Sequence, residues 1–219
     1  MTIMHHLDPA TLAAYSAGTL GEPLAAVVAC HLDWCGACRA ELLRFDAVGG
    51  ELLQSSDEVS MSAGALSTVM ARLSAEPDRP AHKPVAPMDA TNEIPRPLRR
   101  LVGSSLQALE WKMLVPGVKQ IRLPLGNPAT GNLVLLKVAG GHKLPEHGHG
   151  GNELTIVLRG AYSDVTGLYQ RGDVADLDGE IEHQPKATDD GDCICLMASE
   201  SKARFKGLVS RLLQPIIGL

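Results

Sequence analysis

The sequence predicts two domains, a small all-α domain followed by an all-β barrel, and three observations lead to this fold class. Apolar residues recur at helical spacing up to about residue 75. Prolines then interrupt every regular pattern over residues 76–97. Beyond them, short apolar runs alternate with turns rich in Gly, Asp and Pro, which is typical of a barrel or sandwich. We therefore place the helical domain at residues 1–75, a linker at 76–97 and the barrel at 98–219.

Composition limits the classes of function. The chain of 219 residues carries a formal net charge of −5, which gives no electrostatic reason to expect a nucleic acid or an anionic membrane as partner. No apolar run approaches the roughly 18–20 residues needed to span a bilayer. The N-terminus also lacks the basic and apolar pattern of a signal peptide. We therefore expect a soluble cytoplasmic protein that does not contact nucleic acid or membrane directly.

Four helices are expected in the first domain. Asp8 and Pro9 provide an N-cap and a proline in the first turn for a helix over residues 9–17. Further helices are expected over 23–32, over 35–54 with a weak point at Gly49-Gly50, and over 57–74. The last of these has an apolar face. The residues of that face are Val59, Ala63, Leu66, Val69, Met70 and Leu73.

The second half changes to the period of two that marks strands. Residues 119–123 alternate between polar and apolar side chains. Three short apolar runs follow, at 133–138, 154–158 and 193–197. Many short strands at close spacing predict a sandwich or a closed barrel.

One group of potential metal ligands lies in the helical domain. His31, Cys35 and Cys38 have the spacing His-x3-Cys-x2-Cys, which puts His31 one helical turn before two thiols at a tight turn. Zinc requires four N or S ligands in a tetrahedron, so one more ligand must come from elsewhere. The pair His5-His6 is the other source of His within this domain, and of the two we favour His6. Such a site would hold the N-terminal segment on the second and third helices.

Two other interpretations of this group are weaker. The segment 34–38, Trp-Cys-Gly-Ala-Cys, looks like a thioredoxin redox motif. That motif follows a β-strand, whereas the residues before Cys35 predict a helix. Two reduced cysteines beside a surface His31 are the remaining alternative, but three ligands at this spacing seldom coincide. The odd number of five cysteines also makes a disulfide framework a poor explanation.

Residues 1–75 resemble the zinc-binding anti-sigma domain, because they combine an N-terminal His with His-x3-Cys-x2-Cys. The resemblance implies that zinc is held by His6, His31, Cys35 and Cys38. It also implies that the domain binds an extracytoplasmic-function sigma factor in a 1:1 complex and hides the surfaces that engage RNA polymerase. The face over 66–73 is then a candidate partner surface, with the core of the domain as an equal alternative.

A second group of ligands lies in the predicted barrel. His147 and His149 are two residues apart, so on a strand they point to the same side. Glu153 follows a short turn at 150–152 and can return to the same place. With Gly141 and Gly160, the spacing Gly-x5-His-x-His-x3-Glu-x6-Gly resembles the first cupin motif at every position. This resemblance implies a jelly-roll barrel with a metal site.

The second cupin motif implies His183 as a further ligand. The sequence departs from that motif at Asp178, Glu180 and Ala187, so the turn before His183 is expected to differ in shape. The alternative for His183 is an exposed loop residue. Three neutral imidazoles and a carboxylate suit several divalent metals, among which we expect zinc.

Cys193 and Cys195 share one face of a predicted strand. We expect two small buried hydrophobic side chains, with oxidisable thiols near the metal as the alternative. Glu146 adjoins His147 but is expected to be a solvated loop residue. No further residue identifies a small-molecule substrate.

The order of the parts is more informative than either part alone. A zinc anti-sigma domain, a Pro-rich linker and a cupin resemble the ChrR-type family of anti-sigma factors over nearly the whole chain. The resemblance implies a regulator of transcription in a stress response rather than an enzyme. It implies that the sigma factor is released when the cupin domain senses singlet oxygen or organic hydroperoxides. The alternative is a metal-dependent cupin dioxygenase or isomerase with a helical extension.

Overall fold

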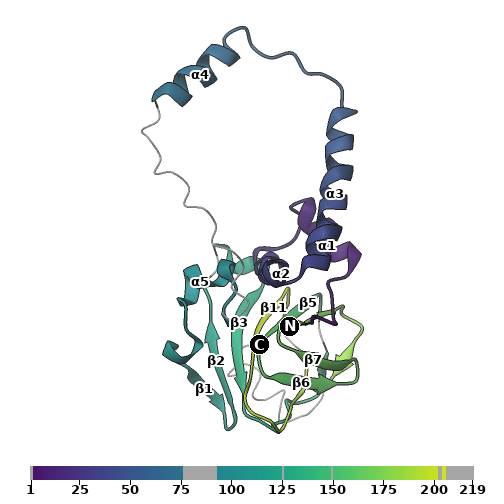
Figure 1. The fold of residues 1–219 in the computed structure, drawn as a ribbon, viewed down its shortest axis with the longest axis vertical. Coiled ribbons are helices and arrows are strands. Elements are labelled where there is room, and N and C mark those ends of the chain that lie inside the picture. The colour runs from purple at the N-terminus through teal and green to yellow at the C-terminus, as the bar shows by residue number, and fades with distance from the viewer. Residues whose placement is uncertain (1, 76–92, 125, 149, 202–203, 206–219) are drawn as a thin grey trace.

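The computed structural model describes residues 2–75, 93–124, 126–148, 150–201 and 204–205 (Figure 1). Helices come first and a β-rich barrel follows, so the predicted fold class is confirmed. In Figure 1 helix α2 lies directly on the barrel, whereas α3 points away from it and α4 stands apart. Within the described residues, no helix is long and apolar enough to cross a membrane.

The first four helices are α1 (Pro9–Ser16), α2 (Glu22–Trp34), α3 (Gly36–Gln54) and α4 (Ala65–Ala75). The predicted N-cap is present, because the Asp8 carboxylate accepts a hydrogen bond of 2.7 Å from the Ala10 amide. Helix α3 continues through the two glycines, since each costs an exposed helix only about 1 kcal/mol. The predicted start of the fourth helix at residue 57 is wrong, because α4 begins only at Ala65. Val59 is exposed, so no packing contact stabilises a helix over residues 57–64.

The barrel begins after helix α5 (Arg96–Val102) and the 3-10 turn η1 (Leu106–Ala108); a second such turn, η2, covers Pro128–Thr130. All strand pairs among the described residues are antiparallel. The largest sheet has the order β1 (Lys112–Val115), β2 (Val118–Arg122), β3 (Asn132–Val138), β11 (Cys193–Ser199), β5 (Glu153–Arg159) and β8 (Val174–Leu177). A second sheet has the order β10 (Lys186–Ala187), β6 (Ala161–Asp164) and β7 (Gly167–Gln170). The third consists of β12 (Arg204–Phe205), β4 (His147–Gly148) and β9 (Glu182–His183).

Both faces of the central strands β3, β11 and β5 are buried. Leu135 and Leu196 are paired across β3 and β11 and belong to the core shared with the helices. Their neighbours Leu136 and Cys195 are also paired and line the interior of the barrel. A strand buried on both sides needs apolar residues at every position, which explains why these segments have continuous apolar runs instead of alternation.

Helix α2 is the element that buries the outer face of this sheet. Leu24, Val27 and Val28 are at most 1% exposed, and α2 packs against β11, β5 and β3. A helix that is apolar on all sides must be covered on all sides. The buried residues of the helical segment and those of the barrel therefore form one shared core.

Most of the predicted linker, residues 76–97, lies outside the described residues. Its last part is described, and there Ile94 is fully buried and belongs to the shared core. Arg96 at the start of α5 forms an ion pair of 2.5 Å with Asp33 near the end of α2. The domain limits at residues 75 and 98 stay a prediction.

We predict that Leu24→Ala lowers the free energy of unfolding by about 2–5 kcal/mol, because it opens a cavity in the shared core. Urea denaturation followed by circular dichroism measures the change, and helical and β signals should be lost together. Leu53→Ala is the matched control, since Leu53 on α3 is 76% exposed and should change stability by less than about 0.5 kcal/mol. Equal effects of the two substitutions would contradict a core that depends on α2.

Candidate metal centres

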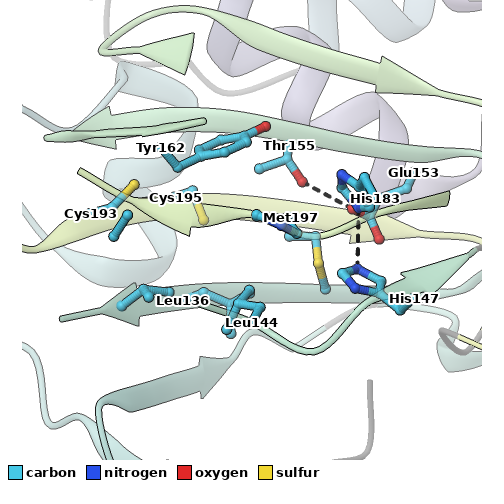
Figure 2. A pocket seen from close by; sticks show the side chains of 13 residues that line it. Leu136, Leu144, His147, Glu153, Thr155, Tyr162, His183, Cys193, Cys195 and Met197 are labelled. Atoms are coloured by element: carbon cyan, nitrogen blue, oxygen red, sulfur yellow. Dashed lines mark hydrogen bonds between the residues drawn. The ribbon is translucent and has the colours of Figure 1, made fainter. Parts of the chain in front are cut away.

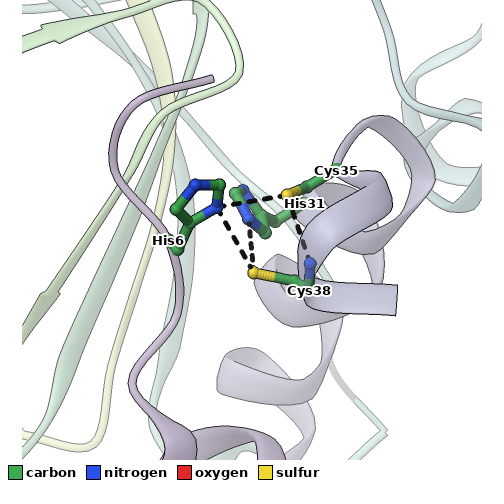
Figure 3. Close-up of side chains that lie close together, drawn as sticks. All are labelled: His6, His31, Cys35 and Cys38. Carbon is green, nitrogen blue, oxygen red and sulfur yellow. Dashed lines mark hydrogen bonds between the residues drawn. The ribbon is translucent and has the colours of Figure 1, made fainter. Parts of the chain in front are cut away.

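The structure brings together the four predicted ligands of the helical segment (Figure 3). His6 Nδ1 lies 3.2 Å from Cys35 Sγ and 3.6 Å from Cys38 Sγ. His31 Nε2 lies 3.3 Å from Cys38 Sγ. All four donor atoms fall within 4.8 Å of one another, and the three residues other than His6 are buried.

The donor set fits a zinc ion. With Zn–S bonds of ~2.3 Å and Zn–N bonds of ~2.0 Å, the edges of a ligand tetrahedron measure about 3.5 Å. The observed separations of 3.2, 3.3 and 3.6 Å agree with such edges. Two imidazoles and two thiols are also the ligand combination of many structural zinc sites.

The junction between α2 and α3 positions three of the four ligands. His31 lies in the last turn of α2, Cys35 is the residue between the helices, and Cys38 lies in the first turn of α3. The Cys35 sulfur accepts a hydrogen bond of 3.4 Å from the Cys38 amide and so caps the N-terminus of α3.

The barrel orients the His31 ring. Its Nδ1 donates a hydrogen bond of 3.0 Å to the carbonyl of Gly172, in the turn between β7 and β8, which leaves Nε2 as the atom that faces the thiols. Gly172 has a φ of 91°, a conformation that favours glycine. Burial lowers the pKa of His31 to about 4, so the ring is neutral and able to bind a metal near pH 7. Burial raises the pKa of the Cys38 thiol to about 11, so metal binding there must displace a proton.

His6, and not its neighbour, belongs to this group. His5 turns to the barrel, where its Nε2 lies 3.1 Å from the Leu168 carbonyl and its ring contacts Tyr169. The thioredoxin interpretation is wrong, because helix α2 and not a strand precedes Cys35. The surface location considered for His31 is also wrong, since this side chain is fully buried.

The second group lies inside the barrel and consists of His147, Glu153 and His183 (Figure 2). His147 on β4 and His183 on β9 are register partners, and their Nε2 atoms are 3.2 Å apart. Glu153 begins β5 and is 3% exposed. The predicted ligand His149 lies outside the described residues, so its place in this group stays a prediction.

The hydrogen bonds of both rings indicate a cation site. His147 Nδ1 donates to the Pro145 carbonyl over 2.8 Å, and His183 Nδ1 donates to Asp164 over 2.7 Å. With Nδ1 protonated in both rings, the two Nε2 atoms direct lone pairs toward each other. A metal ion between the two nitrogens and the Glu153 carboxylate would satisfy this arrangement, and a carboxylate behind a metal-binding His is a common support.

Sequence reasoning missed Asp164. Its side chain is fully buried, and it lies 19 residues before His183 on another strand, so no local spacing marks it. Burial alone would raise the pKa of Asp164, but hydrogen bonds from His183 and Thr166 lower it overall. A carboxylate that stays ionised at this position holds the His183 ring in place.

The departure from the second cupin motif does not displace His183. Asp178 accepts a hydrogen bond of 3.0 Å from the Glu180 amide, so an Asx-type turn forms where the motif has Pro and Gly. The His183 side chain is 3% exposed, and the alternative of an exposed loop residue is therefore wrong. Glu146, in contrast, is exposed, as predicted.

A cavity of about 40 Å³ adjoins the second group. Its wall includes Cys193, Cys195 and Met197 on β11, and Figure 2 shows the two cysteines at the end away from the histidines. Both cysteines are buried as predicted, yet they also border the cavity. Burial raises the pKa of the Cys193 thiol to about 12, so it is protonated near neutral pH.

Comparison with known proteins agrees with this arrangement. The ChrR cupin-like domain family matches residues 100–203. The anti-sigma-E factor ChrR of Cereibacter sphaeroides is 43% identical over 215 residues, which cover 98% of each chain. A crystal structure of Rhodobacter sphaeroides SigE in complex with the anti-sigma ChrR matches with a TM-score of 0.77 and 42% identity. That match covers 90% of this chain and 99% of the other. The chain therefore belongs to the ChrR family of anti-sigma factors, which carry a cupin-like domain after their helical segment.

Proposed function

We propose that this chain is a cytoplasmic anti-sigma factor that binds an extracytoplasmic-function sigma factor in a 1:1 complex. The observation that carries the proposal is the full-length likeness to a ChrR chain solved together with SigE. A sigma factor acts on RNA polymerase, and this supports the proposed cytoplasmic location. The negative charge of this chain is consistent with a protein partner rather than with nucleic acid.

The exposed helices supply a surface for that partner. Leu66, Val69, Met70 and Leu73 share one face of α4, and each is at least 49% exposed. No residue of α4 is buried, so within the described residues this face is not part of a core. Large exposed apolar patches mark sites of protein association. The structure thus favours the partner surface over the intradomain core that the sequence left open.

Helix α3 extends the same kind of surface. Its exposed apolar residues are Leu43, Val48, Leu52 and Leu53. Cys38, at its first turn, is its one buried residue. A partner held between α3 and α4 would bury exposed apolar side chains of both helices at once, and desolvation of that area would provide the main driving force.

The His6, His31, Cys35 and Cys38 group is proposed to hold structural zinc. It joins the start of the chain to the α2–α3 junction, so the ion would fix the direction in which α3 leaves the barrel. When bound, zinc supplies free energy of folding to the segment that binds it. The support for zinc is the donor set and its spacing.

The cupin group is proposed to hold a second divalent metal, zinc by preference, with His147, His149, Glu153 and His183 as ligands. We propose that this centre senses singlet oxygen or organic hydroperoxides, because imidazoles and the nearby sulfur atoms are electron-rich. The cavity of about 40 Å³ has room for only a few water-sized molecules, which favours a small reactive species over the substrate of a dioxygenase or isomerase.

We predict that Cys35→Ser removes one zinc equivalent and weakens binding of the sigma factor at least about 10-fold, because α3 loses its fixed direction. Metal analysis and a pull-down with the co-expressed sigma factor measure the two effects. Cys30→Ala is the control, since Cys30 is buried in α2, five residues before Cys35, but lies outside the ligand group. Undiminished sigma binding by zinc-free Cys35→Ser would refute the structural role.

A second prediction concerns the face of α4. Val69→Asp with Leu73→Asp should weaken sigma binding at least about 10-fold, because burying an unpaired charge in an interface is costly. Thermal stability of the free chain should not change, since both residues are exposed. Thr68→Asp with Ala71→Asp adds the same two charges on the opposite, exposed side of the helix and should keep full affinity. Loss of binding in both variants would mean that charge alone, and not the apolar face, is responsible.

A third prediction separates sensing from inhibition. His147→Ala and Glu153→Gln should still inhibit the sigma factor, because both leave the His183–Asp164 hydrogen bond in place and both residues lie on barrel strands, not on α3 or α4. Release of the sigma factor under illumination with a photosensitiser should be lost in both variants. Transcription from a sigma-dependent reporter measures inhibition in the dark and release in the light. Unchanged release would show that the cupin centre is not the sensor.

A further inference from the structure

The N-terminal segment before α1 is held by the barrel. The amides of Met4 and His5 donate hydrogen bonds of 2.7 and 3.1 Å to Oδ1 of Asp173. The His5 carbonyl accepts from the Val174 amide at the start of β8. Asp173 is 2% exposed, and its other oxygen accepts from the Gln170 amide. Because His6 is the next residue, its position at the first centre is set by a turn of the barrel.

The same turn also holds a second ligand of the first centre. Gly172 adjoins Asp173, and its carbonyl accepts the hydrogen bond from His31 Nδ1. Both imidazole ligands of the first centre therefore depend on residues 172–173. The two cysteines, in contrast, lie at the α2–α3 junction.

A chain of contacts runs from this turn along the β6–β7 hairpin to the second centre. The Tyr169 ring lies against the His5 ring, with 4.2 Å between the centroids. The Tyr169 hydroxyl is 2.9 Å from Thr166 Oγ1, and Thr166 donates its own proton to Asp164 Oδ1 over 2.5 Å. Thr166 has a single hydroxyl proton, so Tyr169 is the donor in the bond between them. Asp164 holds His183 with its other oxygen.

We propose that the β6–β7 hairpin, residues 161–170, couples the two metal centres. In this arrangement the orientation of His183 fixes Asp164, which fixes Thr166 and Tyr169, and Tyr169 supports the segment that presents His6. The inference rests on the proposed function in one respect, namely that both groups bind metal. A turn of His183 away from Asp164 would leave a buried carboxylate to find new partners, and Thr166 is its nearest other contact.

Coupling of this kind is a free energy between two sites, and it is reciprocal. Displacing His183 should lower the affinity of the first centre for its metal, because His6 is held less firmly. Removing the metal from the first centre should lower the metal affinity of the second centre by the same factor. Couplings between sites in proteins commonly amount to about 5–150-fold. A merely structural hairpin would change the stability of the fold without linking the two affinities.

The test is a double-mutant cycle on the full chain loaded with zinc. The measured quantity is the rate at which a maleimide modifies Cys35 and Cys38, followed peptide by peptide in a mass spectrometer. His183→Ala should raise that rate at least about 5-fold in the parent chain. In the Thr166→Val background, where the hydroxyl link is cut, His183→Ala should change the rate less than about 2-fold.

Two further variants sharpen the result. Tyr169→Phe keeps the ring on His5 but removes the hydroxyl, so it should act like Thr166→Val. Val165→Ala is the matched control, because Val165 is 79% exposed between Asp164 and Thr166 and has no part in the contacts. The control should keep the full response to His183→Ala. Competition with a chromophoric chelator then checks that each centre changes the zinc affinity of the other by one common factor.

The outcomes are distinct. If the effect of His183→Ala is the same in the parent, Thr166→Val and Tyr169→Phe chains, coupling through the hairpin is overturned while the two metal centres stand. If the parent chain binds no zinc at either centre, the proposed function fails, and the coupling falls with it. A loss of the response in the Thr166→Val and Tyr169→Phe chains alone supports the proposal.

Discussion

The burial of α2 against the outer face of the large sheet is the constraint on which the rest of the structure depends. Leu24, Val27 and Val28 fill the space over β11 and β5, so the helical segment and the barrel share one core. At roughly 25 cal/mol for each Å² of apolar surface removed from water, a few fully buried side chains contribute several kcal/mol. A single hydrogen bond between the two parts contributes less, about 0.5–1.5 kcal/mol.

This contact determines where the first metal centre can form. Its proposed ligands His31, Cys35 and Cys38 lie in or directly after the buried part of α2, so the barrel fixes their location. The barrel turn at 172–173 also contacts this centre, because it accepts hydrogen bonds from the His31 ring and from the N-terminal segment that carries His6. The first centre therefore connects the helical segment to the barrel, and it also joins the N-terminal segment to the α2–α3 junction.

Much of this arrangement was predictable, and the reason is that it depends on local spacing. The spacing of His31, Cys35 and Cys38 follows from one helix end, and that of His147 and Glu153 from one strand turn. Asp164 and the Gly172 carbonyl could not be predicted in the same way, because they approach their histidines from distant parts of the chain. The shared core was missed for a related reason. Periodicity shows that α2 is apolar but not which surface covers it.

The sizes of these interactions indicate which of them a signal can change. A tenfold change in the affinity of a partner corresponds to about 1.4 kcal/mol. The packing of α2 on the sheet contributes several kcal/mol, so a change of this size cannot separate α2 from the barrel. A single hydrogen bond contributes about 0.5–1.5 kcal/mol, so the loss of one or two polar contacts is of the right magnitude. The contacts that join the two centres, from His183 through Asp164 to the N-terminal segment, are of this kind. The loss of a few hydrogen bonds between the two centres can therefore change the affinity for a partner while the core keeps the chain folded.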